Sequence, residues 1–203
     1  MNLITLSAIL ILSQQAIAQT NTTDMGAMPS QSPGTDMRHS DGGLPHYNDG
    51  QIATIVKTAN DVDIKGGRLA KKRAHRTDVR KFAQLMINDH SAANRKLDKI
   101  VSDIGLNKTE TDDSRKMKDM AKATTDHLKS VKKRDFDYEY IQSELAMHQQ
   151  VLTDLENNLI PQVKNDNFRK YLNEVHAKVS DHLERAKKID TAMSTDRTMS
   201  SNH

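Results

Sequence analysis

From residue 68 to the C-terminus the chain contains a single glycine, Gly105, and a single proline, Pro161. These two residue types are the ones that most strongly interrupt helices, so a stretch this poor in both favours a few long helices. Aromatic residues make up only 3% of the chain and tryptophan is absent, whereas a β-sandwich would use more aromatic and β-branched side chains. The sequence therefore predicts an all-α protein.

Apolar residues recur at three- and four-residue spacing in this stretch, which is the pattern of amphipathic helices. We expect helices over about residues 48–75, 77–104, 112–132, 135–160 and 166–193. The capping and breaking residues that set these limits are Asn48 or Asp49, Thr77, Gly105, Asp135 and Pro161. Four long helices with one stripe each predict a four-helix antiparallel bundle with one additional shorter helix, followed by a disordered tail over 194–203.

Each long stripe is interrupted once by an ionisable side chain. These interruptions are Asp63, Asp89, His148 and His182. A helix rises about 1.5 Å per residue, so Asp63, 12 residues before the end of its helix, and Asp89, 12 residues into the next, lie at one level of a hairpin. His148 and His182 differ in level by about 6 Å. We therefore expect the four side chains to meet in one core layer, flanked by His90.

Such a layer has three interpretations, and the residues alone leave all three open. Imidazole and carboxylate ligands suit iron, manganese or zinc, and helical bundles hold these metals through inward side chains. The layer could instead be a metal-free cluster in which aspartate orients histidine. It could also be a pH switch, because histidine titrates near neutral pH. Glu144 lies one turn before His148 on the same face, and His176 flanks the last stripe.

The N-terminal sequence MNLITLSAILILSQQAIAQT predicts export. An apolar run over 3–12 is followed by the small-residue pattern of a secretory signal peptide, with cleavage after Ala18. The run is too short to span a bilayer, and no later segment is apolar enough to do so. The chain has no cysteine, which excludes thiolate metal sites and lipid attachment at an N-terminal cysteine. We expect a periplasmic or secreted protein.

Residues 19–47 carry three of the four prolines and four of the eight glycines, so we expect a disordered linker. The linker also contains side chains that could bind copper through thioether or imidazole groups. These are Met25, Met28, Met37, His39 and His46. A plain polar tether explains the composition equally simply and is the interpretation that we favour.

The charge pattern argues against a nucleic-acid partner. The 30 basic and 27 acidic residues leave a net charge of only +3. No run of lysine and arginine exceeds three residues, and no aromatic ladder accompanies these runs. We therefore expect neither nucleic acid nor a membrane span. The sequence leaves three possible partners: a metal ion, a second copy of the chain, or an envelope protein.

Four strings carry a resemblance to a known family: DIKGGRLAKKRA, VRKFAQLMINDHSAANRKL, FDYEYIQSELAMHQQVLTDLE and VSDHLERA. Over about residues 48–193 they resemble the DUF4142 family of exported bacterial proteins. The resemblance implies a ferritin-like helical bundle, with an inward acidic residue at Asp63, an Asp-His pair at Asp89 and His90, and later histidines at His148 and His182. Lys65 stands where family members commonly carry a second acidic residue.

The sequence departs from ferritin-like di-iron proteins, which carry Glu-x-x-His on two helices. No such motif occurs here, so a ferroxidase or di-iron oxygenase is not supported. The first functional hypothesis is a ferritin-like protein that binds a metal through Asp63, Asp89, His90, His148 and His182 and serves metal handling or envelope and oxidative stress. The second is a structural or interaction module with a metal-free layer. A metal-dependent oxidoreductase is the third, and the ligand set is sparse in carboxylates for it.

Overall fold

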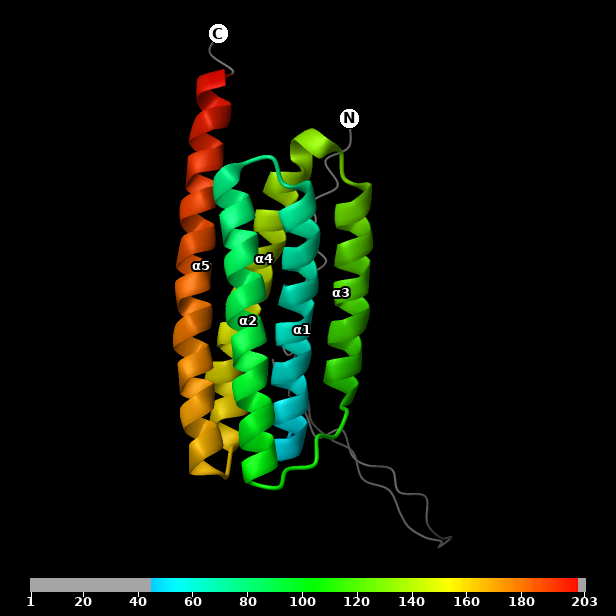
Figure 1. Cartoon of the computed structure of the whole chain (residues 1–203), viewed down its shortest axis with the longest axis vertical. Coiled ribbons are helices and arrows are strands. Elements are labelled where there is room, and N and C mark those ends of the chain that lie inside the picture. Colours follow the sequence, from blue (N-terminus) through cyan, green and yellow to red (C-terminus); the bar gives the residue numbers. More distant parts are fainter. Residues whose placement is uncertain (1–44, 201–203) are drawn as a thin grey trace, which may run out of the picture.

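The computed structural model describes residues 45–200, and these residues form helices joined by short connections (Figure 1). The five α-helices are α1 (Asp49–Arg73), α2 (Thr77–Asp103), α3 (Asp112–Ser130), α4 (Phe136–Asp154) and α5 (Asp166–Ser200). No strand occurs in this part of the chain. The prediction of an all-α bundle is thus confirmed. The expected signal peptide and residues 19–44 of the expected linker lie outside the described residues, as do the linker methionines and His39.

Two antiparallel hairpins, α1 with α2 and α4 with α5, form the main body of the bundle (Figure 1). Helix α3, which has 19 residues like α4, runs along the outside against α1 and α4. It carries the chain from one end of the bundle to the other, so that α4 begins at the same end as α2. The α1–α2 hairpin is especially close at Gly67, where an added Cβ would lie 2.8 Å from the carbonyl oxygen of Ala83.

The helix ends follow the expected signals at most positions. Asn48 caps α1 through a capping box, in which its side chain accepts a hydrogen bond from the backbone N–H of Gln51 at 2.9 Å. Gly105 ends α2 with a φ of 65°, a backbone conformation that favours glycine. The expected cap at Thr77 is wrong, because Arg76 occupies the N-cap position and Thr77 is the first helical residue.

The ends of α4 and α5 differ from expectation. Helix α4 ends at Asp154. A π-helical segment (Leu155–Leu159) follows it, and then a 3-10 turn (Ile160–Gln162) that contains Pro161. Proline lacks an N–H and its ring clashes with the preceding helical turn, so regular α-helix stops several residues earlier. Helix α5 continues to Ser200, which corrects the expectation of a disordered tail beginning at residue 194.

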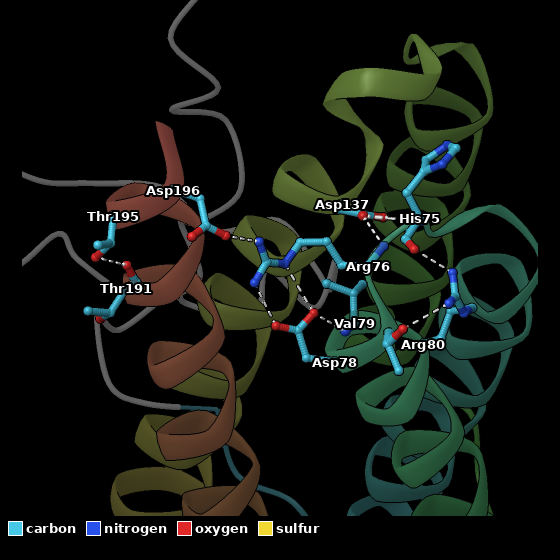
Figure 2. A network of polar contacts seen from close by, with 10 residues as sticks. His75, Arg76, Asp78, Val79, Arg80, Asp137, Thr191, Thr195 and Asp196 are labelled. Carbon is cyan, nitrogen blue, oxygen red and sulfur yellow. Dashed lines mark hydrogen bonds and ion pairs between the residues drawn. The ribbon is translucent and has the colours of Figure 1, made fainter. Parts of the chain in front are cut away.

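A polar network at one end of the bundle accounts for part of this extension (Figure 2). The Arg76 guanidinium, at the α1–α2 turn, pairs with Asp196 on α5 and with Asp78 on α2. The carboxylate of Asp137, at the start of α4, accepts hydrogen bonds from the backbone N–H groups of His75 and Arg76, the latter at 2.7 Å. The turn is thereby fixed to both helices of the second hairpin.

The apolar core consists of two clusters with a polar layer between them. One cluster is centred on residues such as Ile52, Leu97 and Leu172, and the other on residues such as Met86 and Phe136. On α1, α2 and α4 the ionisable residues at the stripe interruption lie between the two clusters, and on α5 His182 lies near their boundary, next to Leu183 of the first cluster. The fold therefore builds a polar compartment in the middle of an apolar bundle.

Candidate metal centre

Three histidine rings from three helices meet in this polar compartment. His90 comes from α2, His148 from α4 and His182 from α5, and each side chain is buried, with at most 5% of the residue exposed. The ring centroids are 5.2 to 5.9 Å apart. One ligand atom from each ring lies within 4.8 Å of the other two. The arrangement could hold a metal ion.

Each ring is oriented by a hydrogen bond from one of its nitrogens. His90 Nδ1 lies 2.9 Å from the amide oxygen of Asn60, and His148 Nδ1 lies 2.9 Å from the carbonyl oxygen of Glu144. His182 Nε2 lies 2.9 Å from Asp89 Oδ2. All three partner atoms are acceptors, so each neutral ring places its single N–H there and leaves a lone pair on its other nitrogen.

The remaining nitrogen of each ring accepts no hydrogen bond from the described residues. His90 Nε2, His148 Nε2 and His182 Nδ1 are buried, and none has a hydrogen-bond partner among the described residues. A buried polar atom without a partner costs about 1–3 kcal/mol. A folded protein rarely tolerates several of them in one place. Three lone pairs gathered in one compartment are the donor set that a metal ion requires.

The His90 ring is held by a chain of amides that extends to the surface. The side-chain amide of Asn60 donates to Asn94 Oδ1 at 2.9 Å, which turns the Asn60 oxygen toward His90. Asn94 in turn donates to Asp61 Oδ1 at 2.7 Å. This chain fixes the tautomer of His90 with Nε2 free.

Two buried carboxyl groups, Asp63 on α1 and Glu144 on α4, adjoin the rings. One oxygen of each lies within 4.8 Å of a nitrogen of His148 and of the other carboxyl. Asp63 Oδ2 is 3.4 Å from His90 Nε2, and Glu144 Oε2 is 3.5 Å from His148 Nδ1. Asp63 Oδ1 and Glu144 Oε2 are also buried without a hydrogen-bond partner in residues 45–200. Asp63 is therefore the nearest source of a fourth, anionic ligand.

Burial decides the charge of all five groups. It raises the pKa of Glu144 to about 8 against the opposing effect of the nearby Tyr140 hydroxyl and Asp63 carboxyl. Burial, and after it the negative charge of Glu144, raises the pKa of Asp63 well above its usual range. Without a cation, these carboxyls retain protons near neutral pH. A bound cation would displace protons and take their place.

The same burial keeps the imidazoles neutral. It lowers the pKa of His148 to about 4, with the nearby His182 acting in the same direction. The pKa of His90 is lowered well below its usual value by burial and by the other two rings. Burial also lowers the pKa of His182, although Asp89 opposes the shift. Neutral imidazole is the form that binds metals, whereas a switch working near neutral pH would need a higher pKa.

A cavity of about 20 Å³ lies beside the cluster. Its polar lining includes Asn60, Asp63, His90 and His148, and the remainder is apolar. This volume is enough for one water molecule, and the polar groups supply the partners that a buried water needs. A metal held by the cluster would therefore have room for one small additional ligand.

Of the five residues predicted from sequence, the structure brings Asp63, His90, His148 and His182 together in the compartment. We expected Asp89 in the core layer and His90 beside it, and the structure shows the opposite. His90 lies in the core, whereas Asp89 lies at its edge with 23% of its side chain exposed. Lys178 lies 3.5 Å from the same Asp89 oxygen that accepts from His182. Asp89 is thus placed to orient the ring rather than to share the compartment.

Sequence reasoning did not place Asn60 or Glu144 among the ligands or their partners. A signal for both exists, since Asn60 lies three residues before Asp63 and Glu144 four before His148, each on the same helix face. His176, the weaker sequence candidate, pairs with Glu156 at 2.7 Å on the exposed side of the bundle.

The fold and the compartment define a class: an all-α bundle with a buried imidazole and carboxylate cluster. The chain belongs to the family described as "Domain of unknown function (DUF4142)", whose model matches residues 35–189. No curated protein and no solved structure matches the chain. Within residues 45–200, no helix combines the length and apolar character required to cross a membrane.

Proposed function

We propose that this protein is an extracytoplasmic, ferritin-like bundle that binds one transition-metal ion through His90, His148, His182 and Asp63. Its role would be metal handling or protection of the cell envelope under oxidative stress. The observation that carries the proposal is the set of three buried ring nitrogens that lack a partner while the opposite nitrogen of each ring is fixed by an acceptor.

The donor set indicates which metals fit. Three neutral imidazoles with one carboxylate suit iron, manganese or zinc, whereas calcium and magnesium prefer oxygen ligands alone. The three acceptors Asn60, Glu144 C=O and Asp89 do what outer partners of metal-bound histidines generally do, namely fix the tautomer and the ring direction. Export of the chain is supported by the sequence pattern of residues 1–18.

The competing function is a structural or interaction module with a metal-free cluster. The hydrogen bond between His182 and Asp89 fits this alternative as well as it fits a metal site. The two differ in what satisfies the free nitrogens, which is a metal ion in the first function and at most one buried water in the 20 Å³ cavity in the second.

A titration of chelator-stripped protein with Co²⁺ tests the proposal. Co²⁺ substitutes for zinc or iron, and its visible absorption reports nitrogen and oxygen ligands. We expect saturation at about one ion per chain in the wild type, followed by competition from Mn²⁺, Fe²⁺ or Zn²⁺ in calorimetry. The variant His148→Ala should lose the signal, and His176→Ala, which changes a half-buried histidine of α5 outside the compartment, should retain it.

Retention of full Co²⁺ binding by His148→Ala, or absence of binding by the folded wild type, would overturn the proposal. Export has its own test. Fractionation of cells that produce the full chain should place the protein, shortened by residues 1–18, outside the cytoplasm. Recovery of the uncleaved chain in the cytoplasm would reject that part.

A further inference from the structure

We infer that one end of the bundle docks on the surface of a lipid bilayer that contains anionic phospholipid. This end holds the α1–α2 turn and the connection from α3 to α4 (Figure 1). The groups that would contact the lipid are five lysines, which we call the lysine cluster. They are Lys71, Lys72, Lys81, Lys132 and Lys133. The inference does not depend on the proposed metal centre, which lies in the middle of the bundle.

The fold brings the two longest basic runs of the chain to the same place. Residues 71–73 end α1, and residues 132–134 follow α3. The guanidinium of Arg73 donates hydrogen bonds to three backbone carbonyl oxygens near the end of α3, at 2.6 to 2.9 Å. Arg80, which precedes Lys81 on α2, donates to backbone carbonyls of the α1–α2 turn. These bonds hold all five lysines at one end of the bundle.

The positive charge of the protein is concentrated at this end. Residues 71–81 and 126–139 contain ten lysine and arginine residues and five aspartate and glutamate residues, which gives a formal charge of +5. The whole chain has a formal charge of only +3. The rest of the chain is therefore slightly negative, and the field of the molecule is that of a bundle with one basic end.

Contacts within the protein occupy every other charged group of these two segments (Figure 2 shows part of them). The carboxylates of Asp78, Asp126, Asp135, Asp137 and Glu139 all pair with a basic side chain or with backbone N–H groups. The four arginines are bonded to carboxylates or backbone carbonyls. The lysines of the cluster are all exposed, and none forms an ion pair with residues 45–200. Their charge is left for an external partner.

Helix stabilisation accounts for only part of the cluster. Lys71 and Lys72 lie in the last turn of α1, where a cation complements the negative end of the helix dipole. Lys81 lies near the start of α2, where the dipole favours anions. Lys132 and Lys133 lie between the end of α3 and the start of α4, where the two effects oppose each other. The remaining lysines need another explanation.

The use of lysine rather than arginine indicates the kind of partner. Arginine has a rigid fork of donors that fits one carboxylate or phosphate group in a fixed position, whereas lysine is a point charge on a flexible stem. This end turns all four arginines toward the protein and exposes lysines alone. Point charges suit the many mobile phosphate groups of a fluid bilayer. Clusters of about four to eight basic residues bind anionic lipid in this way.

A nucleic-acid partner fits these residues less well. Proteins that bind single strands stack the bases on exposed aromatic side chains. In these two segments Phe136 is buried and Tyr138 is half-buried. Docking by the end of the bundle would also leave its sides free, including the edge where Asp89 is partly exposed.

The test is cosedimentation of residues 19–203 with lipid vesicles, because the apolar segment 3–12 would itself bind lipid. One set of vesicles is phosphatidylcholine with about 30% phosphatidylglycerol, and the other is phosphatidylcholine alone. We expect binding to the anionic vesicles alone in about 25 mM salt and its loss in about 500 mM salt, because salt screens exposed charges. Millimolar inorganic phosphate at constant ionic strength should release no protein.

Two fourfold variants locate the binding surface. The first removes charge from the cluster by the substitutions Lys71→Gln, Lys72→Gln, Lys132→Gln and Lys133→Gln. The second removes the same charge from exposed lysines at the opposite end by Lys99→Gln, Lys116→Gln, Lys164→Gln and Lys170→Gln. The first should bind roughly a hundredfold more weakly or less, since each lysine contributes about fivefold. The second should bind nearly as tightly as the wild type.

Four outcomes would overturn the inference. The wild type could fail to bind anionic vesicles in low salt, or could bind phosphatidylcholine equally well. Equal losses in the two variants would assign the binding to net charge rather than to this end. Release by inorganic phosphate, or tighter binding to duplex DNA than to vesicles at equal phosphate concentration, would assign the lysines to a different anion. Failure of Co²⁺ binding would reject the metal proposal and leave this inference standing.

Discussion

Replacing His148 with leucine should stabilise the metal-free protein. The two side chains are similar in size, and residue 148 is fully inside the bundle, with 1% exposed. Leucine removes the unpartnered Nε2 atom. The bond that is lost, from Nδ1 to the Glu144 carbonyl, goes to an oxygen that also accepts the ordinary α-helical hydrogen bond from residue 148.

The size of the effect follows from the cost of one buried unpaired polar atom. That cost is about 1–3 kcal/mol, and little is lost to offset its removal. For a domain of this length, the melting temperature should rise by roughly 2–12 °C. A structural role for the same ring predicts the opposite sign, because the neutral hydrogen bond from Nδ1 to the Glu144 carbonyl would then contribute about 0.5–1.5 kcal/mol that leucine cannot replace.

The assay is thermal and urea unfolding of chelator-treated wild type and His148→Leu near pH 6, followed by a repeat with added metal. We expect the variant to be the more stable protein without metal. Metal should raise the melting temperature of the wild type alone, because a ligand stabilises only a state that binds it. A destabilised His148→Leu variant, with no metal effect in the wild type, would refute the reasoning.

Three further predictions follow from the same structure. The metal-free protein should lose stability between about pH 6.5 and 8, at about 1.4 kcal/mol per pH unit for one proton, because the pKa of Glu144 is raised to about 8 and the folded state retains a proton that the unfolded chain has released. Glu144→Gln should reduce this slope by the contribution of one proton in urea unfolding at a series of pH values, leaving the contribution of the neighbouring Asp63 carboxyl; an unchanged slope would show that Glu144 holds no proton in the folded state. Asp89→Asn should weaken metal binding about 10- to 100-fold in calorimetry, because Asp89 orients His182, while the melting curve without metal stays close to that of the wild type. Gly67→Ala should destabilise the bundle by about 1–3 kcal/mol in urea unfolding, because its methyl group would lie 2.8 Å from the Ala83 oxygen; wild-type stability would show that the two helices separate freely there.

Most of the fold could be predicted from sequence because helix formation leaves strong local signals. The near absence of glycine and proline and the regular apolar spacing placed every α-helix within a few residues at most ends. The errors lie where tertiary contacts override local signals. Helix α5 extends past residue 193, where Asp196 pairs with Arg76, and Arg76 rather than Thr77 precedes α2.

The candidate site was harder to predict. An apolar stripe shows which side of a helix faces the core, but it does not show which of two adjacent residues at its edge points inward. Neighbouring residues differ by about 100° around a helix, so Asp89 and His90 both lay within the uncertainty of the α2 stripe. Packing placed His90 inward and Asp89 at the edge. Spacing along α1 places Asn60 on the same face as Asp63, but it does not indicate the hydrogen bond that Asn60 forms with His90 on α2.

The most direct test of the central claim is elemental analysis of the mature chain, produced without a histidine tag and purified without chelator, beside His148→Ala/His182→Ala. A metal-binding compartment predicts about one iron, manganese or zinc ion per wild-type chain and almost none in the double variant. A wild-type protein that contains no metal, even after incubation with each of these ions, would contradict the claim and leave a metal-free cluster at the centre of the bundle.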